Sequence, residues 1–275
     1  MNILEAVLLG IVEGLTEFLP VSSTGHLTIV EGLLGLQTDD ASVTGFTAVI
    51  QVGAILAAIL YFRRDIARFT MAFLRGLRSA DARQEVDWRL ALGVIAGSLP
   101  IMVVALAARE LITGPLRSLW VVAVALIVWS GVMVVSEKVA SHSRHERDTT
   151  LRDAIIIGLV QCLALVPGVS RSGATISAGL FRGLDRVAST RLSFFLGIPA
   201  LVAAGGYQLK DAVVGGVGWI PTLVATIVSF VVAYVSIAWL LRFVAGHSIA
   251  VFAGYRVALG LVIMGLLATN VISAT

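Results

Sequence analysis

The chain has 275 residues, of which 58% are hydrophobic and only 13% are charged. That balance excludes an ordinary soluble domain, in which about a quarter of the residues are charged. The net charge of +3 does not indicate nucleic acid as a partner, because the basic residues gather in short segments between long apolar runs, where they report membrane topology. We therefore expect an all-α polytopic membrane protein.

The first hydrophobic stretch, residues 3–36, is too long and too interrupted for one straight helix. It is broken by the sequence LPVSSTGH at 19–26. A second stretch, 153–182, is broken in the same way by VPGVSRSGAT at 166–175. Pro and Gly end helices, so each stretch predicts two short helices that meet at a turn inside the membrane.

The remaining apolar segments are continuous and long enough to cross a hydrocarbon core. The expected spans are about 44–62, 90–108, 118–136, 192–209, 219–241 and 249–270.

Basic residues indicate how these segments are oriented. Sixteen of the 20 lie in four connecting segments, at 63–89, 137–152, 182–191 and 242–256. These segments share one side of the membrane only if each broken stretch enters and leaves by the same face. The positive-inside rule makes that side cytoplasmic. We therefore expect six transmembrane helices and two re-entrant helical hairpins, one entering from outside and one from inside.

The two broken stretches are also similar in sequence. Residues 5–25 align without gaps on 153–173 at a constant offset of 148. Because the charge pattern gives the two copies opposite orientations, we expect an inverted-topology repeat within a single membrane domain, 1–275. Repeat 1 covers about 1–140 and repeat 2 about 150–272. The identical pairs are Ala6/Ala154, Gly10/Gly158, Val12/Val160, Leu15/Leu163, Val21/Val169, Ser22/Ser170 and Gly25/Gly173.

Both breaks are followed by what reads as a helix start rich in hydroxyl residues. Ser and Thr cap helices, and the free N–H groups of a first turn bind anions such as phosphate. Two such starts facing each other suit a ligand with two phosphates. The offset places Arg171 opposite Ser23, and Arg forks onto phosphate oxygens.

Two carboxylates and a histidine accompany the first break. Glu13 and Glu17 lie four residues apart on one helix face, where a pair near phosphate predicts a divalent cation such as Mg²⁺. The alternative is an interfacial position near a helix end. His26 is close enough in sequence to Ser22 and Ser23 to act as a general acid or base, and the alternative is a structural histidine.

The sequences EGLTEFLPVSSTGHL at 13–27 and PGVSRSGAT at 167–175 resemble the two motifs of the bacterial undecaprenyl pyrophosphate phosphatase family, also called the bacitracin resistance protein family. The resemblance extends over essentially the whole chain. It implies a multi-pass hydrolase of the bacterial cytoplasmic (inner) membrane that converts undecaprenyl diphosphate to the monophosphate carrier used in peptidoglycan synthesis. It further implies bacitracin resistance and a site that faces the periplasm or outside.

The resemblance also implies roles for individual residues. Ser23 is the expected nucleophile and His26 its acid–base partner, Glu13 and Glu17 handle a metal or protons, and Arg171 clamps the diphosphate. The expected cofactor is a divalent cation, Mg²⁺ or Ca²⁺, and the expected partners are the lipid substrate and membrane lipid. The oligomeric state stays open, with a homodimer as one alternative. The residues expected to bind the diphosphate are Arg171, Ser22, Thr24, Gly25, Ser170, Ser172, Gly173 and Thr175.

Two alternatives stay open. Glu or His could activate water directly instead of Ser23 forming a phosphoserine. Inverted repeats with broken helices are also a transporter architecture, so the second function is a secondary transporter or flippase of a lipid phosphate.

Overall fold

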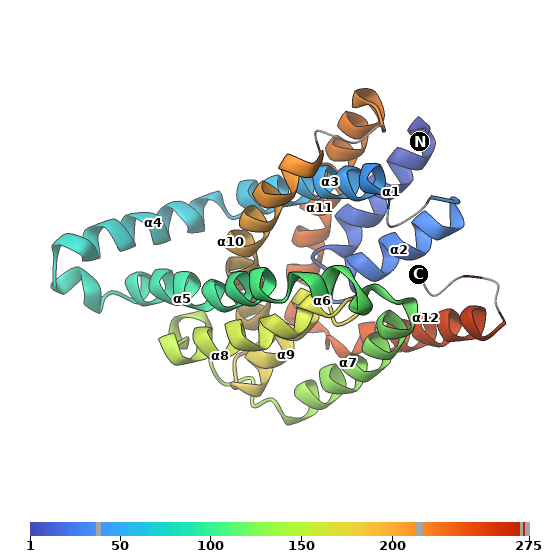
Figure 1. The fold of residues 1–275 in the computed structure, drawn as a ribbon. Coiled ribbons are helices and arrows are strands. Elements are labelled where there is room, and N and C mark those ends of the chain that lie inside the picture. The colour runs from blue at the N-terminus through green and yellow to red at the C-terminus, as the bar shows by residue number, and fades with distance from the viewer. Residues whose placement is uncertain (37–39, 213–216, 270–271, 273–275) are drawn as a thin grey trace.

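The computed structural model describes residues 1–36, 40–212, 217–269 and 272 (Figure 1). Helices supply the regular structure of these residues, which confirms the expected all-α class. Among them, six helices are long and apolar enough to cross a membrane. These are α3 (Ala41–Tyr61), α5 (Val86–Ala107), α7 (Leu119–Val139), α10 (Arg186–Ala212), α11 (Trp219–Gly246) and α12 (Ala250–Ala268).

Both broken stretches have the predicted form of two helices around a break. The first consists of α1 (Ile3–Thr16) and α2 (Ser23–Leu33). The second consists of α8 (Leu151–Gln161), the short 3-10 helix η4 (Cys162–Leu165) and α9 (Arg171–Phe181). The sequence therefore locates the breaks, whereas the re-entrant path of each hairpin stays a prediction.

The packing of the two halves follows the same plan. Helix α1 packs along α11, and α8 packs along α5. A Cβ at Gly10 would lie 2.5 Å from the Ala225 carbonyl oxygen, and one at Gly158 would lie 2.0 Å from that of Gly97. Only a residue without a side chain permits such close approach of two helix backbones. Because Gly10 and Gly158 are an identical pair of the alignment, this packing supports the predicted repeat, whose boundaries stay a prediction.

The segment 63–89 is a structured projection, although the sequence pattern suggested a connecting loop. Helix α4 (Arg63–Arg78) and the 3-10 helix η1 (Asp81–Gln84) extend with the start of α5 away from the body (Figure 1). Helix α4 is amphipathic: Phe69 and Ala72 are buried, and the Phe73 ring stacks on Trp88 of α5 at 5.3 Å. Basic side chains therefore occupy the outer faces of a helix that buries its apolar face.

Three short helices complete the described structure. They are α6 (Arg109–Thr113), η2 (Pro115–Arg117) and η3 (Glu146–Asp148).

Candidate active site

The two breaks lie against each other in the interior. The Ser22 hydroxyl accepts a hydrogen bond from the backbone N–H of Gly168 at 3.2 Å, and the Ser172 hydroxyl donates one to the Leu19 carbonyl at 2.9 Å. Each break thus supplies a serine that bonds to the backbone of the other. Irregular backbone buried in a membrane protein must find such partners, and here the breaks supply them to each other.

Arg256 of α12 holds both breaks from a third side. Its Nη1 donates to the Pro20 carbonyl at 3.0 Å, while Nη2 donates to the carbonyls of Gly168 and Val169 at 2.8 and 3.1 Å. Its Nε donates to the Ser130 hydroxyl at 3.2 Å. The side chain is 0% exposed, and within the described residues it forms no ion pair. Backbone carbonyls of the two breaks therefore stabilise the buried guanidinium of Arg256.

This position corrects one sequence-based expectation. The charge pattern counted Arg256 with the cytoplasmic segment 242–256, but α12 begins at Ala250 and carries Arg256 into the interior. The misleading signal was its closeness to the start of an apolar span. An arginine inside a span is by itself an indication of function, and the sequence analysis missed it.

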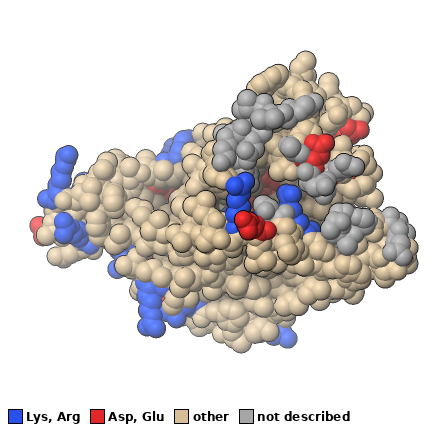
Figure 2. Space-filling view, in the orientation of Figure 1, with Lys and Arg blue, Asp and Glu red and all other residues tan. Residues whose placement is uncertain are grey.

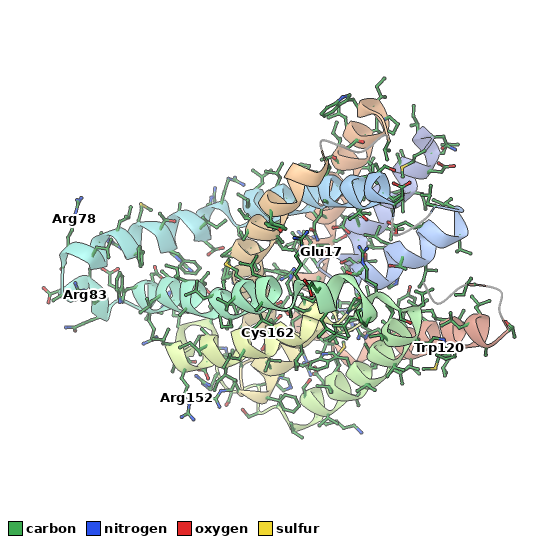
Figure 3. The ribbon with its side chains drawn as sticks, in the orientation of Figure 1. Glu17, Arg78, Arg83, Trp120, Arg152 and Cys162 are labelled. Carbon is green, nitrogen blue, oxygen red and sulfur yellow. The ribbon has the colours of Figure 1, made fainter. Side chains whose placement is uncertain are left out.

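Glu17 lies where the two motifs meet. Its Oε2 accepts a hydrogen bond of 2.7 Å from the Ser23 hydroxyl, and its Oε1 lies 3.4 Å from Nη2 of Arg171. The carboxylate is 7% exposed and follows the last turn of α1. Figure 3 labels it near the middle of the molecule. Ser23 and Arg171, which the offset of 148 placed opposite each other, are therefore joined through one carboxylate.

The Arg171 guanidinium is held by α10 as well. Its Nη1 donates to the Ser193 carbonyl at 3.2 Å. A Cβ at Gly197 would come within 1.8 Å of Nη1, so the guanidinium occupies the space that this glycine leaves. Nε has no hydrogen-bond partner in the described part of the chain. Arg171 thus retains an N–H donor that no described protein group engages.

Glu13 lies one turn before Glu17 on α1 and is 1% exposed. Its Oε1 has no hydrogen-bond partner among the described residues. A buried carboxylate oxygen without a partner calls for a cation or a proton. Within the described residues, groups of three or more His, Cys, Asp or Glu side chains placed to hold a metal are absent. The donor set therefore fits a cation that takes one or two protein carboxylates and completes its shell with phosphate oxygens and water, as Mg²⁺ does.

His26 lies near the start of α2 but bonds to groups other than Ser23. Its Nδ1 faces the Ser22 carbonyl at 2.8 Å, and its Nε2 faces the Tyr255 hydroxyl at 2.6 Å. Sequence reasoning paired His26 with Ser23, whereas in the structure the Ser23 hydroxyl bonds to Glu17. Tyr255 was missed, because nothing local in the sequence links it to a residue 229 positions away.

The remaining residues expected at the diphosphate fall into two groups. Thr24 and Gly25 belong to the first turn of α2, where the Thr24 side chain is exposed. On α9, the Ser170 hydroxyl caps the N–H of Gly173 at 3.2 Å, and Thr175 is buried and bonds to the Ser193 hydroxyl at 2.6 Å. Together with the Ser172 bond to Leu19, these contacts give the hydroxyls of Ser170, Ser172 and Thr175 to protein groups. Of the side chains expected at the diphosphate in the second motif, Arg171 is then the one left for an anion.

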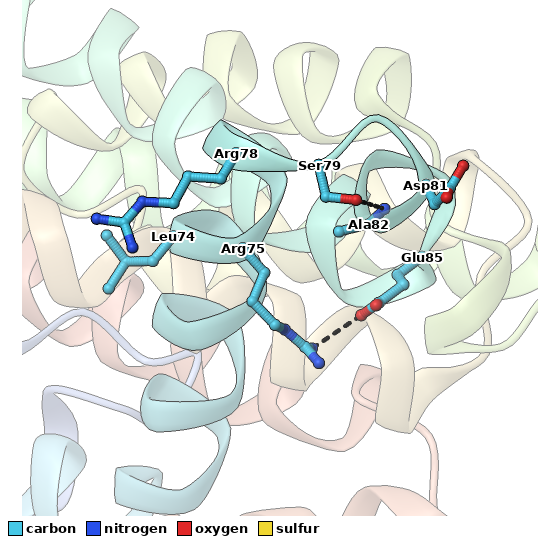
Figure 4. Close-up of a pocket in the computed structure, with 7 residues that line it drawn as sticks. All are labelled: Leu74, Arg75, Arg78, Ser79, Asp81, Ala82 and Glu85. Carbon is cyan, nitrogen blue, oxygen red and sulfur yellow. Dashed lines mark hydrogen bonds and ion pairs between the residues drawn. The ribbon is translucent and has the colours of Figure 1, made fainter.

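One face of the molecule is hollowed near its middle. Figure 2 shows acidic and basic side chains gathered around a hollow near the middle of one face, in the part of the molecule where Figure 3 labels Glu17. A different pocket lies at the end of the α4 projection, where Arg75 bonds to Glu85 at 2.9 Å (Figure 4). It contains no residue of either motif and lies far from Glu17.

Comparison with known proteins agrees with this arrangement. The family model described as bacitracin resistance protein BacA matches residues 6–262. The chain is 59% identical to "Undecaprenyl-diphosphatase 3" of Frankia casuarinae and covers all of both chains. It is 58% identical to "Undecaprenyl-diphosphatase 1" of Streptomyces avermitilis over 99% of each chain, and 55% identical to "Undecaprenyl-diphosphatase" of Cutibacterium acnes over all of both. The chain therefore belongs to the bacitracin resistance protein BacA family.

Proposed function

We propose that this protein is an undecaprenyl-diphosphate phosphatase, which hydrolyses undecaprenyl diphosphate to undecaprenyl phosphate and inorganic phosphate. The observation that carries the proposal is the Glu17 carboxylate, which contacts both the Ser23 hydroxyl and the Arg171 guanidinium. The proposed nucleophile Ser23, its base Glu17 and the anion-binding guanidinium of Arg171 thus lie together inside a membrane protein. The names of the relatives support the same substrate. The activity recycles the peptidoglycan lipid carrier and so confers bacitracin resistance.

The membrane setting suits a lipid substrate. An apolar prenyl chain can lie between the spanning helices while its diphosphate reaches the two breaks, so the lipid stays in the bilayer. The proposed location is the bacterial inner membrane, with both broken stretches re-entrant and the site open to the outer face. The segments 63–89 and 137–152 supply the cytoplasmic positive charge that supports this orientation.

The first step is proposed to be transfer of the terminal phosphoryl group to Ser23. The hydroxyl oxygen attacks the terminal phosphorus, and its proton passes to Oε2 of Glu17, 2.7 Å away. The bond between that phosphorus and the bridging oxygen breaks, and undecaprenyl phosphate leaves. Arg171 holds the phosphate oxygens and stabilises the charge that develops on them.

The second step releases phosphate from phosphoserine. A water oxygen attacks the phosphorus while the bond from phosphorus to the Ser23 oxygen breaks, and that oxygen recovers its proton from Glu17. The water proton passes to His26 and then to solvent. In this scheme Glu17 serves the serine and His26 serves the water.

Glu13 and Glu17 are the residues that would hold a divalent cation, Mg²⁺ or Ca²⁺. When bound, such an ion neutralises charge on the phosphate oxygens. The orphaned Oε1 of Glu13 is the feature that supports this cofactor. The proposal predicts that a chelator lowers the rate and that Mg²⁺ restores it.

The test is phosphate release from undecaprenyl diphosphate by the full-length protein in detergent, compared with the Arg171→Ala variant. We expect turnover by the wild type and its loss in Arg171→Ala, with unchanged elution on size exclusion. Near-normal turnover by the variant would remove the clamp role, and a wild type without turnover would remove the function.

A second candidate function is transport of the lipid monophosphate across the bilayer. The matched close contacts at Gly10 and Gly158 favour it, because such paired halves are a transporter architecture. Protein-dependent translocation of undecaprenyl phosphate in reconstituted vesicles would support it, and translocation equal to that of empty vesicles would remove it.

A further inference from the structure

The contact between Tyr255 and His26 has the geometry of a hydrogen bond that fixes an imidazole. The Tyr255 hydroxyl lies 2.6 Å from Nε2 of His26. The two rings are stacked, with centroids 5.6 Å apart and planes at 16°. Tyr255 is 50% exposed and precedes Arg256, so neighbouring residues of α12 contact the first break and its histidine.

The other ring nitrogen identifies the tautomer. Nδ1 faces the backbone carbonyl of Ser22 at 2.8 Å, and a carbonyl oxygen can only accept. Nδ1 therefore carries the proton. In a neutral imidazole Nε2 is then an acceptor, so the Tyr255 hydroxyl donates to it. The ring is held at both nitrogens and along one face.

We propose that Tyr255 is a positioning residue of the active site, which holds the His26 ring through Nε2 and along one face while the Ser22 carbonyl keeps the proton on Nδ1. The inference rests on the proposed function, in which Nε2 of His26 takes a proton from water once that water has replaced the Tyr255 hydroxyl at Nε2. A base whose ring is already oriented needs only this exchange before it acts. The contact also explains why Ser23 bonds to Glu17, since the lone pair of Nε2 is already engaged.

The first test measures the tautomer without reference to activity. Full-length protein with ¹⁵N-labelled histidine has four histidines, and a His26→Asn variant assigns the His26 signals. At a pH where the imidazole is neutral, we expect a protonated Nδ1 and an unprotonated Nε2. In Tyr255→Phe, which keeps the stacked ring, we expect Nδ1 to stay protonated because the Ser22 carbonyl is unchanged, and we expect the Nε2 shift to move because its hydrogen bond is lost. A proton on Nε2 in the wild type, or identical shifts in the variant, would overturn the proposal.

The second test separates positioning from structure. Loss of the partner that orients a functional histidine typically lowers activity by about tenfold or more. We expect Tyr255→Phe to lower kcat for phosphate release by about tenfold with KM unchanged. The matched control is Tyr234→Phe, which removes the hydroxyl of a tyrosine whose ring packs on Tyr61. An unchanged kcat in Tyr255→Phe would overturn the role.

The two readouts keep this inference distinct from the proposed function. If the wild type shows no phosphatase activity, the proposed function fails, while the ¹⁵N shifts still decide whether Tyr255 holds Nε2 of His26. If phosphatase activity is present and both readouts are unchanged by Tyr255→Phe, only the positioning role fails.

Discussion

The two breaks have nearly the same backbone and different chemistry. Each begins its second helix after a serine with positive φ, 77° at Ser22 and 75° at Ser170. This conformation is uncommon for residues other than Gly and clusters at functional sites. The first break carries Glu17 and Ser23, whereas the matching positions of the second hold Leu165 and Arg171. The two breaks thus share one backbone design, and in the proposed mechanism a few sequence differences make the first an acid–base half and the second an anion-binding half.

The buried residues that precede the two breaks, on α1 and α8, also differ in charge. Glu13 matches Gln161 at the offset of 148, and both are almost fully buried. Within the described residues, Glu13 has an unpartnered Oε1, and neither polar atom of the Gln161 amide has a partner. A neutral amide cannot supply the charge that a cation or a proton requires. This difference places the proposed cation at the first half alone.

Removal of the acid–base function from the first break is expected to have the largest effect. Glu17→Gln keeps the shape of the side chain but cannot accept the Ser23 proton. We expect kcat for phosphate release to fall by about a hundredfold or more. Glu5→Gln is the control, because Glu5 caps the exposed start of α1. Retention of more than half the rate in Glu17→Gln would show that the proton goes elsewhere.

The second largest effect is expected from loss of the Arg256 guanidinium, which joins the two breaks. Arg256→Met leaves the carbonyls of Pro20, Gly168 and Val169 without its donors, and each buried unsatisfied group costs about 1–3 kcal/mol. We expect the free energy of unfolding to fall by about 3 kcal/mol or more and phosphatase activity to disappear. Thermal unfolding in detergent measures the change in stability, and phosphate release measures the activity. The control is Arg242→Met, at the exposed end of α11, which should change neither the stability nor the activity. If Arg256→Met were as stable as the wild type, Arg256 would not join the two breaks as described.

A smaller change tests the anion-binding half. In Gly197→Ala the new methyl group collides with Nη1 of Arg171 and displaces the guanidinium. We expect KM for the lipid diphosphate to rise by about tenfold, equal to about 1.4 kcal/mol of binding, with a smaller change in kcat. Gly206→Ala on the same helix is the control, because nothing lies within 4 Å of its added carbon. Equal KM values for the two variants would argue against the placement of Arg171.

The smallest expected effect lies away from the breaks. A hydrogen bond to Asp185 at 2.5 Å raises the pKa of the exposed His145 above its ordinary value. Stability from this pair is therefore fully present below about pH 6.5 and lost as pH rises through the raised pKa. In Asp185→Asn the His145 pKa should fall toward 6.5 with unchanged phosphatase activity, measured by NMR titration and phosphate release. A titration that does not move would contradict the pairing.

The sequence predicts the local features of the fold but not the contacts between residues that are distant in the chain. Hydropathy and Pro–Gly punctuation located the six spans and both breaks, and the offset of 148 aligned Ser23 with Arg171. The partner of His26 could not be predicted, because Tyr255 approaches it only through tertiary packing. For the same reason the hydroxyls of Ser172 and Thr175 were assigned to a diphosphate, although Leu19 of the first break engages one and Ser193 of α10 engages the other. Periodicity shows which residues share a helix face but not what that face meets.

The position of Arg256 along the chain has a consequence for biogenesis. Ribosomes deliver residues 20 and 168 well before residue 256, so a nascent chain can insert both breaks while still lacking the side chain that joins them. The last described span, α12, therefore supplies the contacts that join two breaks already inserted before it. We therefore expect a chain stalled before the insertion of α12 to be embedded in the membrane but without phosphatase activity.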